Sequence, residues 1–126
     1  MFHQVKVPIH DSDCLRFYWW SNGELDRKPE VYKMMVHLFG AVSSPSCSNT
    51  ALRKTATANK DEFKLEIIDT VLKNFYVDDC LKSCDTETKA ISVVQDLISI
   101  CHKGGLNLTK WITNSHMVLK SIPVDS

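Results

Sequence analysis

The sequence predicts a mixed α+β fold, in which helices pack on one face of an antiparallel sheet. Two observations lead to this prediction. Segments rich in β-branched and aromatic residues occur in pairs that turn residues separate, which is typical of hairpins. Between them lie segments whose apolar residues recur at helical spacing. The expected order is a hairpin, a helix, a second hairpin, a helix and a final strand, as in many α+β domains.

The first hairpin is expected over residues 16–39. Its first strand is the aromatic-rich segment Arg16–Trp20, and its second strand is Val31–Phe39. The segment Ser21–Gly23 between them is a turn signal, because Asn-Gly favours positive φ. A short helix is expected just before this hairpin, over residues 11–15, where aspartates and a serine can cap it.

The next segment predicts a helix that begins at Ser44 and runs to about Ala58. Ser44 is placed at the cap, and Pro45 lies in the first turn, where its missing N–H costs nothing. A second, shorter helical stretch should follow, with Asp61 as its cap. Its apolar side consists of Phe63, Ile67 and Ile68.

A second hairpin is expected over residues 71–84. The segment Val71–Val77 is β-branched and aromatic, which favours a strand. Asp78 and Asp79 follow it, and Cys80–Cys84 can form the returning strand. The simplest interpretation is therefore a strand, a two-residue acidic turn and a strand.

The most regular helical period covers residues 86–103. It starts at Asp85 or Thr86 and is stopped by the pair Gly104–Gly105. Its apolar residues are Ala90, Val93, Val94, Leu97, Ile98 and Cys101. After the glycines, Leu106–Ile112 alternates between apolar and polar residues, which predicts a last strand.

Composition sets limits on the function. The 126 residues are enough for one domain with a single core. The 15 basic and 15 acidic residues cancel, so net charge gives no support to nucleic-acid binding, which is usually associated with basic domains. No apolar stretch approaches the roughly 20 residues of a membrane-spanning helix, and we expect no membrane partner. The N-terminus lacks the basic and apolar regions of a signal peptide.

The five cysteines are odd in number and their spacing does not repeat. Because the sequence shows no signal peptide and no membrane-spanning stretch, they are expected to be reduced thiols of an intracellular protein. A zinc site at Cys80, Cys84, Cys101 and His102 is not expected, since this spacing is looser than in known zinc motifs. Both ends of the chain begin or stop within an apolar pattern, at Met1–Val5 and at Ile122–Val124. We therefore expect a domain that is truncated at both ends.

The acidic pair of the second hairpin is the main candidate for chemistry. Two adjacent carboxylates at a hairpin tip repel each other unless a cation lies between them. Their hard oxygen atoms are ligands that Mg²⁺ prefers, and such ions assist phosphoryl transfer. The alternative is structural, because aspartate is also a favoured turn residue. Asp78 and Asp79 taken alone therefore do not establish a metal site.

The surrounding sequence is more specific. The string Phe75–Asp79 resembles the Tyr-x-Asp-Asp box of reverse transcriptases. Three other segments resemble boxes of that family in the same order: Phe2–Val5 is similar to the tail of the first catalytic box, Leu38–Pro45 to the Phe-Gly…Pro box, and Gly105–Lys110 to the later box that ends in lysine. The residues of these segments, together with Leu15–Trp20, most resemble those of Bel/Pao-type LTR retrotransposon polyproteins.

This resemblance implies that residues 1–126 form a partial reverse transcriptase domain, a fingers and palm segment with a palm-like sheet. Asp78 and Asp79 would be two of the three carboxylates that hold two Mg²⁺ ions in this nucleotidyltransferase. The third carboxylate would lie five positions before Phe2, outside this sequence. The isolated chain is therefore expected to be inactive. The implied partners are an RNA or DNA template-primer, deoxynucleoside triphosphates and the rest of the polyprotein, in the cytoplasm or a virus-like particle.

The resemblance also implies roles for five further residues. Lys110 would be a catalytic proton donor to the pyrophosphate leaving group, and Phe2 would exclude a ribose 2′-hydroxyl. Gln4, Gly40 and Tyr76 would contact substrate, Gly40 by allowing close approach of the backbone. Structural roles are the alternatives: Phe2 in the core, Gln4 as support for the sheet, Gly40 as a turn residue, Lys110 as a solvated lysine, and Tyr76 facing the core.

Two other functions remain open. The chain can be a catalytically inactive retrotransposon remnant that at most binds nucleic acid or a protein. It can also be an unrelated α+β interaction domain with a chance Asp-Asp turn. In every case we expect the isolated chain to be marginally stable or to aggregate, because sheet edges and apolar faces would be uncovered.

Overall fold

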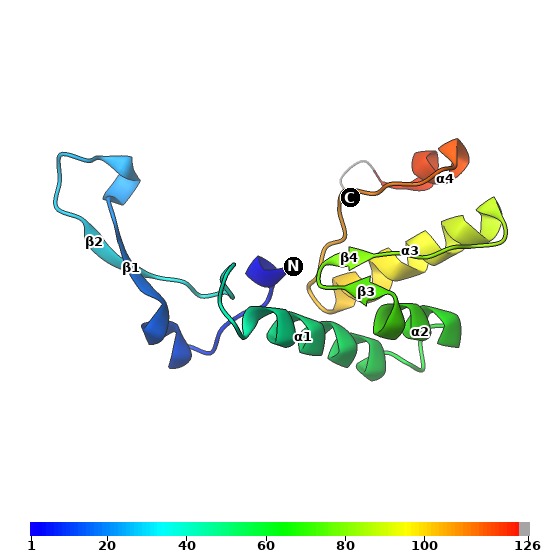
Figure 1. Cartoon of the computed structure of the whole chain (residues 1–126), viewed down its shortest axis with the longest axis horizontal. Helices are drawn as coiled ribbons and strands as arrows, with labels where there is room; N and C mark the ends of the chain where they lie inside the picture. The colour runs from blue at the N-terminus through cyan, green and yellow to red at the C-terminus, as the bar shows by residue number, and fades with distance from the viewer. Residues whose placement is uncertain (124–126) are drawn as a thin grey trace.

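The helices of the computed structural model, which describes residues 1–123, pack around one apolar core. Helices α1 (Ser44–Ala58), α2 (Leu65–Lys73) and α3 (Glu87–Lys103) contact one another, and α4 (His116–Ser121) packs on α3 (Figure 1). The buried core residues are Leu52, Ala56, Ile67, Ile68, Val71, Val93, Leu97, Ile100, Cys101 and Leu106. Among the described residues, no helix is long and apolar enough to cross a membrane.

The strands form two small antiparallel sheets instead of the single sheet that the sequence predicts. Strand β1 (Arg16–Trp19) pairs with β2 (Glu30–Lys33), and β3 (Phe75–Tyr76) pairs with β4 (Asp79–Cys80). The mixed α+β class is thus confirmed. Short 3₁₀ helices cover Phe2–Gln4, Asp11–Leu15 and Ser21–Gly23, of which the second matches the short helix expected before the first hairpin.

The first hairpin is confirmed, but its second strand ends at Lys33 and not at Phe39. The following residues pair with the N-terminal segment instead. The Val7 N–H donates to the Met35 carbonyl at 2.9 Å, and the His37 N–H donates to the Val5 carbonyl at 3.0 Å. One extended segment can pair with two different segments along its length. The pattern of apolar and polar residues does not show where one pairing ends and the next begins.

The bounds predicted for α1 are confirmed, but its cap is not Ser44. Ser43 holds the cap position without a side-chain hydrogen bond, and Ser44 is the first helical residue. The hydroxyls of Ser44 and Ser48 are buried, and neither has a hydrogen-bond partner among the described residues. Pro45 lies in the first turn as expected.

The strand predicted over residues 71–77 is largely wrong, because Val71–Lys73 is the last turn of α2. Val71 lies four residues after Ile67, so both side chains reach the core from one helix face. This helical spacing outweighs the β propensity of the segment. The expected cap at Asp61 is also wrong, since the cap position of α2 is Lys64.

Helix α3 is confirmed. The Thr86 hydroxyl accepts a hydrogen bond from the Lys89 N–H at 3.2 Å, and Gly104 follows the last helical residue. The strand predicted over residues 106–112 is not formed, although Leu106 and Leu108 do face the core as alternation predicts. Lys110 has a φ of 61°, which interrupts an extended backbone. Helix α4 was not predicted from the sequence; its signal is the cap Ser115, whose hydroxyl accepts from the Val118 N–H at 3.3 Å.

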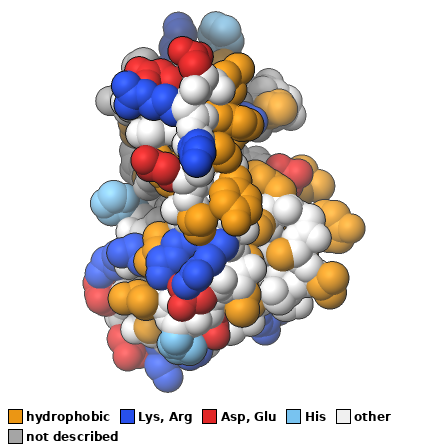
Figure 2. Space-filling model, turned by 90° about the vertical axis from the view of Figure 1, so that its left-hand side faces the viewer, with side chains coloured by type: hydrophobic (Ala, Val, Ile, Leu, Met, Phe, Trp, Pro, Cys, Tyr) orange, Lys and Arg blue, Asp and Glu red, His pale blue; other side chains and the backbone are white. Residues whose placement is uncertain are grey.

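The hairpin β1–β2 projects from one end of the molecule, away from the helices (Figure 1). All eight of its strand residues are exposed, so neither of its faces is covered by another described element. Figure 2, which views the molecule from this end, shows hydrophobic side chains along one side of the projection. The apolar stretch Ile122–Val124, within which the domain was expected to be truncated, lies partly outside the described residues.

The contact between α1 and the end of α3 yields a stability prediction. A Cβ added at Gly104 would lie 2.8 Å from Cγ2 and 3.0 Å from Cβ of Thr55, a β-branched side chain that cannot move away freely. We expect Gly104→Ala to lower the free energy of unfolding by about 1–3 kcal/mol. Urea denaturation measures this loss.

The control is the same substitution in a Thr55→Ala background. There the clash is mostly removed, and Gly104→Ala should cost much less than it does in the native background. An equal cost in both backgrounds would contradict the contact.

Candidate functional site

The β3–β4 hairpin carries the acidic pair, but its turn is not the one predicted. Tyr76 pairs with Asp79, so the two turn residues are Val77 and Asp78, and Asp79 begins the returning strand. The base of the hairpin is closed by Asn74: its side-chain amide donates to the Leu81 carbonyl at 2.8 Å, and its own carbonyl accepts from the Leu81 N–H at 3.1 Å.

The two faces of this hairpin differ. Phe75 and Cys80 are opposite each other and pack against the helical core. Tyr76 and Asp79, the other opposed pair, are exposed, and Tyr76 retains 82% of its accessible surface. The core therefore fixes one face of the hairpin and leaves the other face, with its carboxylate, in contact with solvent.

The turn is strained at Val77. This residue has a φ of 58°, a left-handed conformation that is unfavourable for a β-branched side chain. Asp78 does not have a positive φ, so the turn has the pattern of type II′, which favours glycine at the position of Val77. Backbone strain of this kind persists only where the surrounding structure holds the residue.

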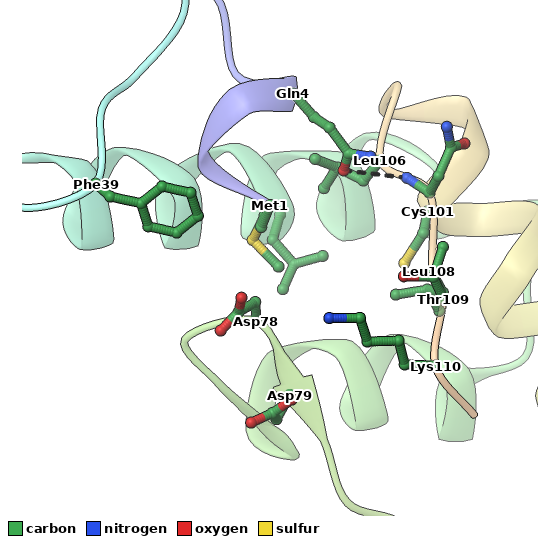
Figure 3. Close-up of a pocket in the computed structure, with 12 residues that line it drawn as sticks. Met1, Gln4, Phe39, Asp78, Asp79, Cys101, Leu106, Leu108, Thr109 and Lys110 are labelled. Atoms are coloured by element: carbon green, nitrogen blue, oxygen red, sulfur yellow. Dashed lines mark hydrogen bonds between the residues drawn. The ribbon is translucent and has the colours of Figure 1, made fainter. Parts of the chain in front are cut away.

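A pocket of about 330 Å³ lies above the tip of the hairpin (Figure 3). Four segments that are far apart in the sequence line it, together with Leu52 of α1 and Cys101 of α3. Gln4 and Met1 come from the N-terminus, Phe39 precedes α1, Asp78 and Asp79 come from the hairpin, and the segment Leu106–Lys110 follows α3. The structure thus brings together Gln4, Asp78, Asp79 and Lys110, four of the residues singled out in the sequence.

The charged groups of this pocket are accessible. Asp78 and Asp79 are both exposed. In Figure 3 the amine of Lys110 is directed toward Asp78, whose carboxylate lies below Met1. Within residues 1–123, neither aspartate forms an ion pair with Lys110 or with any other cation. Both carboxylates therefore face solvent without a cationic partner among the described residues.

Gln4 has a structural contact in this site. Its side-chain oxygen accepts a hydrogen bond from the Asn107 N–H at 3.2 Å, and this bond joins the N-terminal segment to the segment after α3 (Figure 3). The bond corresponds to the supporting role considered for Gln4.

The aromatic residue that lines the pocket is Phe39. Phe2 is only 8% exposed and is not part of the lining. Its ring meets that of Phe39 edge-on, with centroids 5.2 Å apart, and His3 meets Phe39 in the same way at 4.8 Å. The burial of Phe2 corresponds to the core role considered for it. Sequence reasoning missed Phe39, although it lies beside Gly40 in one of the quoted boxes.

Gly40 and Tyr76 lie outside this pocket. Gly40 has a φ of 84°, so a turn geometry requires glycine there, but a Cβ at this position would meet nothing within 4 Å. Tyr76 lines a second hollow of about 520 Å³ on the hairpin, which shares Asp78, Asp79 and Lys110 with the first. The acidic pair therefore lies between two adjoining hollows.

The cysteines near the pocket are held as thiols. Burial raises the pKa of Cys101, which lines the pocket, to about 12, and burial also raises the pKa of Cys80. A thiol that stays protonated is a poor nucleophile and a poor metal ligand. In the part of the chain that the structure describes, no three His, Cys, Asp or Glu side chains converge to form a metal site.

No protein-family model, curated protein or solved structure matches this chain.

The strain at Val77 leads to a prediction. We expect Val77→Gly to raise the free energy of unfolding by about 1 kcal/mol, because glycine adopts positive φ without the penalty of a β-branched residue. Thermal or urea denaturation measures the change.

Val42→Gly is the matched control. Val42 is almost fully exposed and does not have a positive φ, so the same substitution there should lower stability by up to about 1 kcal/mol through backbone entropy. A loss of stability at both positions would show that the turn is not strained.

Proposed function

We propose that this chain is part of the palm of a retrotransposon-type RNA-directed DNA polymerase and that the pocket at Asp78 and Asp79 is its nucleotidyl-transfer site. One observation carries the proposal. The segments that resemble the four boxes of that family are spread over more than a hundred residues, and each contributes a residue to this one pocket. Four separate sequence resemblances and their meeting at one place support each other.

The donor set at the hairpin tip fits a divalent cation of the Mg²⁺ type. Asp78 and Asp79 offer hard, exposed carboxylate oxygens, and no Lys, Arg or His of residues 1–123 forms an ion pair with them. In the family that the sequence resembles, a third carboxylate completes such a metal site. Bound metal ions of this kind polarise phosphate oxygens and lower the pKa of a coordinated hydroxyl.

The remaining side chains suit the handling of a nucleoside triphosphate. Lys110 places a cation on the same pocket as the two carboxylates, where it can neutralise a leaving pyrophosphate or supply its proton. Phe39 provides an apolar wall for a sugar or base, and the buried ring of Phe2 fixes its position. Tyr76 lines the adjoining hollow, through which a primer strand would enter. Gln4 acts indirectly, because it holds the pocket wall at Asn107.

Primer extension tests this proposal. The substrate is a homopolymer RNA template with a DNA primer, and the protein is assayed both alone and after extension with its upstream coding sequence. We expect the chain alone to be inactive and the extended protein to incorporate deoxynucleotides with Mg²⁺ or Mn²⁺. Asp78→Asn should lower incorporation by the extended protein at least about 100-fold, because a metal ligand is lost.

The control is Asp85→Asn, which removes an exposed carboxylate that is not part of the pocket and should leave activity unchanged. Failure of the extended protein to incorporate nucleotide, while it still binds the template-primer, would contradict the proposal. It would favour an inactive remnant that only binds nucleic acid.

A further inference from the structure

We propose that the outer edge of β1 pairs with the same edge of a second copy of this chain, so that two hairpins form one four-stranded antiparallel sheet across a two-fold axis. This inference concerns a surface remote from the acidic pocket and is independent of the proposed function. It rests on the exposure of β1, on the direction of its backbone groups and on the difference between the two edges of its hairpin.

Strand β1 is an apolar strand without cover. Tyr18 is 70% exposed, Trp19 56% and Phe17 41%, and no further strand of residues 1–123 pairs with the hairpin. The hairpin lies at one end of the molecule, away from helices α1 to α4 (Figure 1). An exposed, apolar edge of this composition is a site for strand addition.

The hydrogen-bond pattern shows which backbone groups face outward. The Met34 N–H donates to the Leu15 carbonyl at 3.0 Å, just before the registered pair Arg16 and Lys33. In an antiparallel ladder, hydrogen-bonded and non-hydrogen-bonded pairs alternate. The backbone groups of Phe17 therefore face β2, and those of Tyr18 face away from the hairpin.

The two edges of the hairpin are not equivalent. Strand β2 is preceded by Lys28 and Pro29 and begins with Glu30, and charged residues and proline are the features that protect edges from pairing. Strand β1 has a single charge, Arg16. Asp13 offsets part of this charge, since one Asp13 oxygen accepts from Arg16 at 2.9 Å and from Lys33 at 3.2 Å. The unprotected edge is thus that of β1.

A two-fold axis at Tyr18 gives a self-complementary register. Tyr18 then lies opposite Tyr18 of the second copy. The two-fold axis also places Phe17 of each copy opposite Trp19 of the other. Trp20 also has an extended backbone, with φ −87° and ψ 127°, so Arg16 can lie opposite Trp20 of the second copy. The opposed pairs are aromatic or cation–aromatic, both of which are favourable, and no like charges face each other. A second copy of the chain therefore fits this edge.

Sedimentation velocity of the whole chain, between about 1 µM and about 1 mM, tests the proposal. We expect a concentration-dependent dimer. Tyr18→Pro removes an outward N–H and should weaken dimerisation at least about tenfold. Its matched control is Val31→Pro. Val31 is paired with Tyr18, so its N–H faces outward on the β2 edge, and the dimer should persist. A monomeric wild-type chain, or a dimer lost with Val31→Pro but kept with Tyr18→Pro, would overturn the proposal.

Charge exchange separates edge pairing from damage to the hairpin. The two-fold axis places the residues at position 18 opposite each other, so Tyr18→Lys and Tyr18→Glu should each be monomeric through like-charge repulsion. An equimolar mixture of the two variants should restore a dimer. Misfolded hairpins, or a dimer formed through a different interface, would not respond to the opposite charge. The absence of association in the mixture would therefore overturn the proposed register.

Discussion

The structure of the site depends on the close packing of α1 against α3. Leu52 and Ala56 of α1 meet Ile100 and Cys101 in one buried cluster, and α1 approaches Gly104 so closely that no larger residue fits there unchanged. The chain leaves α3 at this point. The Leu106 N–H donates to the Cys101 carbonyl at 2.9 Å, and Leu106 is buried, so the segment that carries Lys110 starts from a fixed position. Helix α2 packs against the same two helices and leads directly into the acidic hairpin.

The pocket needs two further contacts that are long-range in sequence. Gln4 bonds to Asn107, and Phe2 meets Phe39 edge-on, so the N-terminal segment closes the pocket from above. The rigid part of the site is therefore helical, and the chemical groups lie on the turns and segments that the helices position. This division is common in proteins, because loops on a rigid scaffold can carry functional groups without burying unsatisfied backbone.

The sequence was most informative where one local signal decided the structure. The serine-proline start of α1, the glycine pair after α3 and the Asn-Gly turn of the first hairpin all mark real boundaries. It misled where tertiary contacts decided: Val71 is β-branched but lies on a helix because its spacing to Ile67 serves the core. For the site, the sequence identifies Gln4, Asp78, Asp79 and Lys110. It does not identify Phe39 and Asn107, because only long-range contacts bring them there.

We propose that Asp78 and Asp79 form a cation site that is open to the pocket. Paramagnetic broadening of amide signals by Mn²⁺ in the whole chain measures this directly. The account predicts selective broadening at Asp78, Asp79 and the pocket residues Thr109 and Lys110, which Mg²⁺ reverses and Asp78→Asn abolishes. Broadening that spreads evenly over all exposed carboxylates, or that persists unchanged in Asp78→Asn, would contradict it.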